Sequence, residues 1–273
     1  MIGNKLKKIK YISYALCNQR QELEKMGDSP GAEYIKKAFL HVKKGKFQKN
    51  NKQKLATLEA YIEELNSNPT EISYEFFGLN EKRKVYEIAQ NAGSPKKWCS
   101  FFYFLTKFSG AKNILEIGTN LGISGQYFLS ALPSGESHFT SLEGVPGLCK
   151  LASERFGKLE NDSDFEVIQG MYDATLPKIA ATEQKFDIVF FDGNHHYQPT
   201  IDYFNLLKGN YSRDAILVFD DINWSSGMKK AWKYLQNESG VYCSIEFYKL
   251  GILLYNPEKK ALPKRDVKLF LTL

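Results

Sequence analysis

The chain has 273 residues, which is enough for one large or two modest domains with a sizeable core. Its composition, with 43% hydrophobic and 25% charged residues, is that of an ordinary globular protein. No apolar run is long enough to span a bilayer, and residues 1–17 lack the apolar centre of a signal peptide, so neither feature is expected. The four cysteines are scattered and form no motif, which favours reduced thiols and a cytoplasmic location.

The net charge of +6 is concentrated near the N-terminus. Residues 1–65 contain 14 Lys and Arg against 7 Asp and Glu, so this part carries +7 and the remainder carries −1. Such a charge attracts anions, but a lysine-rich solvated helical face is the favoured explanation. Because residues 43–54 contain no interleaved aromatic side chain besides Phe47, a nucleic-acid surface is not expected.

The N-terminal third of the chain is predicted to be helical. Its expected helices are 5–26, 31–44 and 52–66, with a further segment at 80–92. The third helix is the clearest, because its apolar residues recur at three- and four-residue intervals. Ser94-Pro95 then opens a helix that leads into the first strand. We therefore expect residues 1–90 to form a helical extension or lid, and residues 91–273 to form the main domain.

The segment KNILEIGTNLGISGQYFL at 112–129 predicts a buried strand, a tight turn and the start of a helix. Gly118 and Gly122 lack a Cβ, so the backbone N–H groups of this turn can come close to a ligand. The G-x-G-x-x-G pattern of dinucleotide-binding proteins is absent. Glu116 at the strand end would repel a pyrophosphate and attract a cation. S-adenosylmethionine, which carries a sulfonium and an amino group but no phosphate, fits this turn.

The rest of the chain alternates strands with helices, which is typical of a parallel α/β sheet. After a helix at 123–132, the expected elements are strand 138–143, helix 146–157, strand 165–169, helix 174–182, strand 186–191, helix 198–208, strand 215–219 and helix 225–238. Residues 243–255 follow without an intervening helix and turn at Lys249-Leu250-Gly251, which predicts a hairpin. The fold class is therefore α/β, with a doubly wound sheet.

Acidic residues follow or end three of these strands. Glu143 ends strand 138–143, slightly more than about 20 residues past the glycine turn, where a carboxylate can accept hydrogen bonds from two ribose hydroxyls. Asp192 and the pair Asp220-Asp221 follow two continuous apolar strands, so they should meet at one edge of the sheet. Three converging acids repel one another unless a cation joins them, and Mg²⁺ suits such oxygen ligands. Alternatively, Glu143 is a surface residue and Asp221 a helix N-cap.

His195 lies three residues after Asp192, in the sequence DGNHHY. A histidine that titrates near neutrality suits the removal of a hydroxyl proton, and a metal would make that proton easier to remove. His196 is a weaker candidate, and both histidines can instead be solvated loop residues. Zinc is not expected, because no cluster of Cys and His has ligand spacing.

The opening E-I-G-T-x-x-G-x-S at 116–124, with FTSLEG at 139–144, GMYD at 170–173 and the later acids, resembles class I S-adenosylmethionine-dependent methyltransferases. The similarity is to the O-methyltransferase branch, both catechol-type and sugar-type, and covers roughly residues 95–255. It implies a Rossmann-like sheet of seven strands, mostly parallel with an antiparallel last strand. It also implies that the helix before the glycine turn helps to cover cofactor and substrate, with Ser94, Trp98 and Phe102 near the site, although core packing explains the aromatic residues as well.

The resemblance further implies roles for individual residues. The cofactor-binding residues are expected to be Glu116, Gly118, Thr119, Gly122, Ser124, Glu143, Gly170, Met171, Tyr172 and Asp192. Met171 and Tyr172 would pack on the adenine, unless the aromatic ring simply caps the core. Asp192, Asp220 and Asp221 match the metal positions, with His195 as general base. Catechol-type enzymes carry Asn in place of Asp221, so the acid here favours the sugar-type pattern.

We therefore expect an S-adenosylmethionine-dependent O-methyltransferase, assisted by Mg²⁺, that acts on a small hydroxylated molecule such as a sugar or phenol. One alternative is a metal-independent methyltransferase acting on oxygen or nitrogen. The other is a non-catalytic protein whose basic N-terminal region binds an anionic partner. A homodimer is left open.

Overall fold

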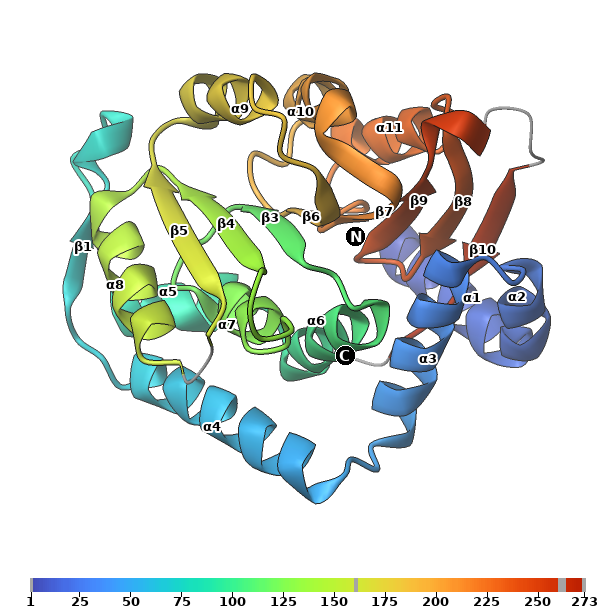
Figure 1. Cartoon of the computed structure of the whole chain (residues 1–273), viewed down its shortest axis with the longest axis horizontal. Helices are drawn as coiled ribbons and strands as arrows, with labels where there is room; N and C mark the ends of the chain where they lie inside the picture. Colours follow the sequence, from blue (N-terminus) through green and yellow to red (C-terminus); the bar gives the residue numbers. More distant parts are fainter. Residues whose placement is uncertain (1, 160–161, 260–263, 272–273) are drawn as a thin grey trace.

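The computed structural model describes residues 2–159, 162–259 and 264–271. Within these ranges, one mixed sheet has eight strands in the order β10-β8-β9-β7-β6-β3-β4-β5 (Figure 1). In chain order they are β3 Asn113–Ile117, β4 His138–Glu143, β5 Asp164–Gln169, β6 Phe186–Phe191, β7 Tyr211–Phe219, β8 Val241–Glu246, β9 Gly251–Tyr255 and β10 Arg265–Lys268. Neighbouring strands are parallel except that β9 runs antiparallel to both β7 and β8.

The α/β fold class and the antiparallel strand near the end of the sheet are confirmed. The sheet nevertheless contains an eighth strand, because β10 pairs in parallel with the outer edge of β8. Three of its four residues, Arg265, Asp266 and Lys268, are charged, so no apolar alternation marks it in the sequence. A separate two-stranded hairpin, β1 Glu71–Ser73 with β2 Lys82–Lys84, is also not predicted, since each strand has only three residues.

Helices cover both faces of the sheet. The α-helices are α1 Ile2–Cys17, α2 Gln19–Lys25, α3 Pro30–Lys44, α4 Lys49–Asn66, α5 Val85–Ala92, α6 Lys96–Ser109, α7 Ile123–Leu129, α8 Pro146–Gly157, α9 Tyr172–Ala180, α10 Tyr197–Leu206 and α11 Ser226–Leu235. Short 3₁₀ turns are η1 Glu75–Phe77, η2 Leu207–Asn210 and η3 Pro257–Lys259. Helices α9, α10 and α11 lie on one side of the sheet, and α3, α6, α7 and α8 lie on the other (Figure 1).

Strand alternation divides the core into two apolar clusters. Ile114 and Phe190 belong to the cluster under α3 and α6, while their neighbours Leu115 and Val189 belong to the cluster under α9 and α10. Successive side chains of a strand point to opposite faces, so unbroken apolar strands fill both layers. The sheet is thus packed against helices on both faces.

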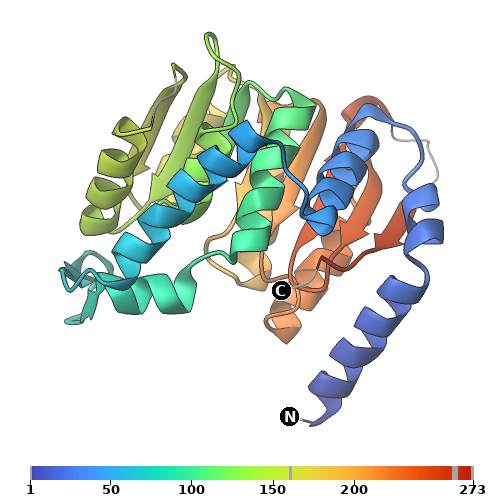
Figure 2. The same cartoon turned by 90° about the horizontal axis from the view of Figure 1, so that it is seen from below.

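The N-terminal helices pack into the same cluster as one face of the sheet, from Met26 through Leu65. The division near residue 90 stays a prediction, and side chains on either side of it share this core. In Figure 2, α4 crosses outside α7, while the N-terminal end of α1 extends beyond the sheet. The Tyr11 hydroxyl donates to the backbone oxygens of Glu246 and Leu269, which fastens α1 to β8 and the chain after β10. No helix in the described ranges has the length and apolar character needed to cross a membrane.

Helix α4 is joined to the glycine turn by hydrogen bonds. The Tyr61 hydroxyl donates to the backbone oxygen of Leu121 at 2.8 Å, and the Gln126 side-chain amide donates to the backbone oxygen of Leu58 at 3.1 Å. Buried polar groups need such partners, because an unpaired one costs the loss of its hydration. The N-terminal extension therefore supports the turn directly.

We expect Tyr61→Phe to lower the free energy of unfolding by about 1–2 kcal/mol, because the buried Leu121 oxygen loses its donor. Tyr103→Phe is the matched control: Tyr103 is similarly buried, but its hydroxyl lies 3.5 Å from Asn51 Oδ1, a weak hydrogen bond. Urea unfolding of both variants measures the difference. Equal losses would show that the Tyr61 hydrogen bond contributes nothing specific.

Candidate functional site

The glycine turn lies at the carboxyl end of β3, close to the end of β6. Gly118 has φ +109°, and a Cβ there would lie 2.4 Å from the backbone oxygen of Asp192. Gly122 has φ +74° and contacts α8 closely, and Asn120 between them also has a positive φ. Only glycine tolerates both the conformation and the close approach at position 118. The turn is therefore shaped by Gly118 and Gly122 as the sequence predicts.

Glu116 is fully buried inside this turn. Its Oε1 accepts a hydrogen bond from Ser124 at 2.6 Å, and its Oε2 accepts one from Ser141 at 2.7 Å. Thr119 Oγ1 lies 2.5 Å from the Ser141 hydroxyl and completes the chain of hydrogen bonds. Burial raises the pKa of Glu116 to about 7. Glu116, Thr119 and Ser124 thus tie β3, β4 and α7 together, and their role in cofactor binding stays a prediction.

Glu143 lies at the end of β4 and faces an open cleft. Its two carboxylate oxygens accept hydrogen bonds from the backbone N–H groups of Asn120 and Val145, both at 2.9 Å. A carboxylate has about four acceptor positions, so two remain for other donors. Burial raises the pKa of Glu143, against the opposing effect of these N–H groups. The residue is positioned, with free acceptor capacity, beside the glycine turn.

The cleft beside Glu143 has a volume of about 960 Å³, within the range that holds a nucleoside-sized ligand. It collects residues from several strand ends and from the N-terminal extension. Its lining includes Tyr74, Phe77, Arg83, Ile88, Asn91, Asn120, Glu143, Val145, Leu148, Met171, Tyr172 and Asn194. Met171 is half exposed. Of the residues predicted to bind a cofactor, the structure therefore brings Glu143, Met171 and Tyr172 together around one opening. Gly170, with φ +153°, precedes Met171 and turns the chain from β5 toward α9.

The hairpin β1–β2 forms one wall of this cleft. A Cβ at Gly144, just after β4, would lie 2.8 Å from the ring of Phe77, so the ring rests directly on the backbone. The Arg83 guanidinium lies 4.9 Å from the centre of the Tyr74 ring and is paired with Glu81 at 2.6 Å. A hairpin that the sequence does not reveal thus borders the cleft, and the lid role of the extension stays a prediction.

Three acids gather where β6 and β7 end, as predicted. The backbone N–H of Asp192 donates to Ile117 and that of Asp220 donates to Phe191, so the ends of β3, β6 and β7 are in register. Asp192 and Asp220 interact directly, and burial followed by the charge of Asp220 raises the pKa of Asp192 well above its usual range. His195 Nε2 lies 3.7 Å from Asp192 Oδ1. His195 is thus placed beside the acids.

Lys249 supplies a positive charge within the acid cluster. Its Nζ lies 2.8 Å from Asp220 Oδ2 and 3.7 Å from Asp221 Oδ1. Burial opposes its charge, but the carboxylates outweigh burial and the pKa of Lys249 is raised. Burial and the charge of Asp220 raise the pKa of Asp221. The ion pairs join the turn between β8 and β9, which contains Lys249, to the end of β7, the strand next to β9.

The arrangement does not fit the predicted magnesium site. Across the described ranges, no three or more His, Cys, Asp or Glu residues are placed to hold a metal ion. The ammonium of Lys249 lies where a cation would neutralise Asp220 and Asp221, and a divalent ion beside it would be repelled. Asp221 is not a helix N-cap either, since α11 is capped by Ser225, whose Oγ accepts from the backbone N–H of Met228 at 3.0 Å.

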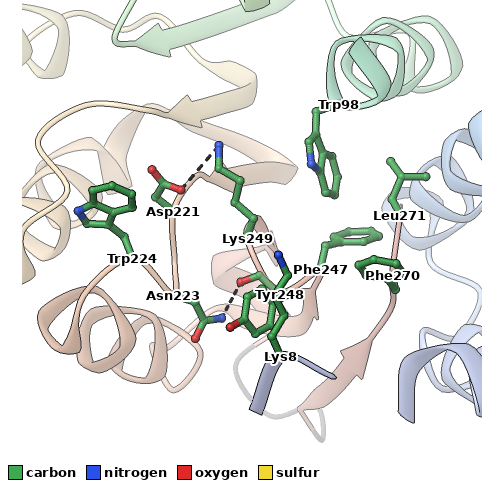
Figure 3. Close-up of a pocket in the computed structure, with 10 residues that line it drawn as sticks. All are labelled: Lys8, Trp98, Asp221, Asn223, Trp224, Phe247, Tyr248, Lys249, Phe270 and Leu271. Atoms are coloured by element: carbon green, nitrogen blue, oxygen red, sulfur yellow. Dashed lines mark hydrogen bonds and ion pairs between the residues drawn. The ribbon is translucent and has the colours of Figure 1, made fainter. Parts of the chain in front are cut away.

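An aromatic pocket of about 270 Å³ lies next to the acid cluster, and both Asp221 and Lys249 line it (Figure 3). It is lined by Lys8, Trp98, Asp221, Asn223, Trp224, Phe247, Tyr248, Lys249, Phe270 and Leu271. Trp98 and Phe247 meet edge to face with ring centres 5.3 Å apart. The indole N–H of Trp98 is buried, and no described residue accepts a hydrogen bond from it. Trp98 therefore lines the pocket beside Asp221 and Lys249, and its place near a cofactor and substrate stays a prediction.

Sequence reasoning missed several residues of these pockets. In the sequence, Lys249 is recognised only as part of a turn. No local pattern indicates its ion pairs with Asp220 and Asp221, which precede it by 29 and 28 positions. Tyr74 and Phe77 lie in a hairpin too short to predict. Asn120 offered a weak signal, because an Asn between two glycines is typical of a left-handed turn.

Comparison with known proteins identifies a methyltransferase segment in the chain. Residues 115–222, less than half of the chain, match the family model described as a methyltransferase domain. A putative O-methyltransferase of Mycobacterium avium (strain 104) is 33% identical over 119 residues, which cover 43% of this chain and 52% of the relative. A putative O-methyltransferase of Mycobacterium leprae (strain TN) is 32% identical over 129 residues, 47% and 56% of the two chains. The chain thus spans about half the length of the curated relatives it matches.

Solved structures share the architecture. The O-methyltransferase TomG from Streptomyces achromogenes, solved with S-adenosylmethionine, superposes with a TM-score of 0.53 at 21% identity, covering 60% of this chain and 81% of TomG. The Podospora anserina methyltransferase PaMTH1, solved with S-adenosylhomocysteine, gives 0.52 at 17% identity and covers 77% and 97%. At these identities the likeness shows the fold. The resemblance to class I S-adenosylmethionine-dependent O-methyltransferases is confirmed by the matched segment and by the fold together.

The raised pKa of Glu116 makes stability depend on pH. The folded protein holds this proton up to about pH 7, whereas the ordinary value is 4.5, so the stabilisation is complete below about pH 4.5 and is lost as the pH rises through 7. The loss amounts to about 3 kcal/mol.

We expect Glu116→Gln to remove this pH-dependent loss of stability, because the amide has no proton to lose. Urea unfolding from about pH 5 to about pH 8 measures it, with exposed Glu166→Gln on β5 as control. An unchanged pH slope in Glu116→Gln would contradict the assignment.

Proposed function

We propose that this chain transfers the methyl group of S-adenosylmethionine to a hydroxyl of a small molecule. The observation that carries the proposal is the single cleft in which Glu143, Met171 and Tyr172 converge beside the glycine turn. This cleft opens at the carboxyl ends of parallel strands, where α/β sheets bind ligands. The matched methyltransferase segment contains all of these residues.

Each part of the cofactor has a partner in the cleft. The free acceptor positions of Glu143 would bind the ribose hydroxyls, since its oxygens are already aligned by the backbone of Asn120 and Val145. Met171 and Tyr172 would cover the adenine with polarisable and aromatic surface. The methionine end would then approach Asp192, whose backbone oxygen is in contact with Gly118. Glu116 would support this end indirectly, through the turn.

The acceptor hydroxyl would enter from the side of the acid cluster. His195, whose Nε2 lies 3.7 Å from Asp192 Oδ1, would receive its proton as the general base. The methyl group then moves in line from sulfur to oxygen, a reaction in which correct placement supplies most of the rate. The aromatic pocket beside Asp221 is large enough for a one- or two-ring acceptor.

Assistance by Mg²⁺ is not part of this proposal. The carboxylates of Asp220 and Asp221, two of the three predicted metal ligands, are already paired with the ammonium of Lys249. In this arrangement the residues do not fit a divalent ion. Lys249 favours the metal-independent alternative. Transfer to nitrogen and a purely binding role have no specific observation in their favour. The cytoplasmic location and a homodimer stay predictions from the sequence.

We expect Glu143→Ala to weaken S-adenosylmethionine binding by about 100-fold, because two hydrogen bonds to a charged acceptor are lost. Isothermal titration calorimetry measures the affinity, and the exposed acid Glu166 on the neighbouring β5 provides the control as Glu166→Ala. Circular dichroism checks that both variants fold. Unchanged affinity in a folded Glu143→Ala variant would remove the proposed cofactor site.

Removal of divalent ions is expected to leave methyl transfer unchanged, because Lys249 already compensates Asp220 and Asp221. Transfer of radiolabelled methyl groups from S-adenosylmethionine to phenols and sugars can be followed before and after dialysis against EDTA. A loss of activity that Mg²⁺ restores would reinstate the magnesium site predicted from the sequence.

A further inference from the structure

We propose that Lys249 is the resident cation of the acid cluster and binds the oxygen of a phenolic acceptor held in the aromatic pocket. The inference rests on the proposed function and names the acceptor class and a further residue of its site. Lys249 lines the aromatic pocket and is also paired with acids at the ends of the strands (Figure 3). Lys249 therefore lies between the aromatic pocket, where the acceptor would bind, and the acid cluster.

The ammonium of Lys249 has hydrogen-bonding capacity left over. It has three N–H donors; one is used by Asp220 at 2.8 Å, and one faces Asp221 at 3.7 Å. The third can bind an oxygen in the pocket. A fixed ammonium differs from a metal ion in charge and in coordination number, so it positions one acceptor oxygen and does not chelate two.

The position of Lys249 is imposed by the backbone. Its backbone oxygen accepts a hydrogen bond from Ile222 N–H at 2.9 Å, and the preceding Tyr248 oxygen accepts one from the Asn223 side chain at 2.6 Å. Tyr248 has φ +71° and Asp221 has φ +52°, both unusual for side-chain-bearing residues. Strained backbone of this kind persists where surrounding contacts enforce it, and it concentrates at functional sites. The turn between β8 and β9 is thus locked to the loop after β7.

The pocket wall favours a flat, apolar ring. Trp98, Phe247 and Tyr248 provide aromatic faces and edges, whereas a sugar would need many hydrogen-bond partners for its hydroxyls. The buried indole N–H of Trp98 has no acceptor among the described residues, and Figure 3 shows it on the side facing Lys249. Two donors, the Trp98 indole N–H and the Lys249 ammonium, therefore lie at a pocket whose wall is largely aromatic and whose polar lining is Lys8, Asp221 and Asn223. This combination fits a phenol that carries a second oxygen substituent.

The chemical step balances without a metal. The phenol oxygen, accepting a hydrogen bond from Lys249, attacks the methyl carbon of S-adenosylmethionine. The new C–O bond forms as the C–S bond breaks, and the bonding electrons return to sulfur, which gives neutral S-adenosylhomocysteine. The phenol proton passes to the imidazole of His195 and then to solvent. Lys249 positions the oxygen and keeps its own proton.

The first test measures metal binding by the full-length protein with Mn²⁺ as the probe. Lys249→Met keeps most of the side-chain volume and removes the charge, so three acids are left without their cation. We expect Lys249→Met to bind Mn²⁺ at least about tenfold more tightly than the wild type in electron paramagnetic resonance titrations. Lys208→Met is the matched control, because Lys208 pairs with Glu238 at 2.7 Å and has the same side-chain exposure of 35%.

A folded Lys249→Met variant that binds Mn²⁺ no more tightly than the wild type would overturn the role of Lys249 as the resident cation. Lys249→Ala repeats the measurement should the methionine variant fail to fold. Titration of each variant with S-adenosylmethionine is independent of this outcome: unchanged affinity is expected, and a wild type that does not bind it would overturn the proposed function and leave the metal result intact.

The second test addresses the acceptor. Wild-type protein with S-adenosylhomocysteine is titrated with catechol, 4-hydroxybenzoate and glucose by calorimetry, and methyl transfer to each is measured with labelled S-adenosylmethionine. We expect binding and transfer with a phenol and none with glucose. Lys249→Met should reduce the turnover number by at least about 100-fold while the KM for S-adenosylmethionine stays unchanged, a split that a purely structural role would not give. Binding of neither phenol, or transfer to glucose, would overturn the assignment.

Discussion

The structure depends on how buried carboxylates are compensated at the ligand edge of the sheet. A carboxylate taken out of water must gain a proton, hydrogen bonds or a cation. Glu116 receives two serine hydroxyls, Glu143 receives two backbone N–H groups, and Asp220 receives the ammonium of Lys249. Each arrangement has a different effect. The hydrogen bonds of Glu116 hold the glycine turn together, those of Glu143 leave acceptor positions for a ribose, and the ion pair of Asp220 fixes the positive charge of Lys249 beside the aromatic pocket.

Most of the architecture can be predicted from local patterns. Unbroken apolar runs such as Ile188–Phe191 identify buried parallel strands, and Gly118 and Gly122 identify the turn, because these features are encoded within a few residues. The acids at the strand ends follow from the topology. The local pattern does not reveal β10, whose charged residues pair only because β8 offers a free edge. Nor does it give the partner of Asp220, which lies in another hairpin and is brought there by the antiparallel return of β9.

The predicted roles of the candidate residues divide according to burial. Glu143, Met171 and Tyr172 line the open cleft, although Glu143 is itself largely buried, so their role in cofactor binding remains a proposal that rests on this position. Glu116, Thr119 and Ser124 match the same motif but satisfy one another within the core. A motif thus records which residues occur together and not which of them touch a ligand. The predicted magnesium site shows the same limit, because three acids in the right places bind different cations depending on a fourth side chain.

The hairpin β1–β2 has a consequence for turnover. It consists of two three-residue strands, and its Phe77 rests on Gly144 at the rim of the cleft. A two-stranded ribbon of this size is barely stable by itself, so its position depends on its contacts with the main domain, where Ile72 of β1 is buried against Gly147 of α8. Exchange of a cofactor through this side of the cleft would require those contacts to open, so Ile72 and Phe77 would act as its anchors.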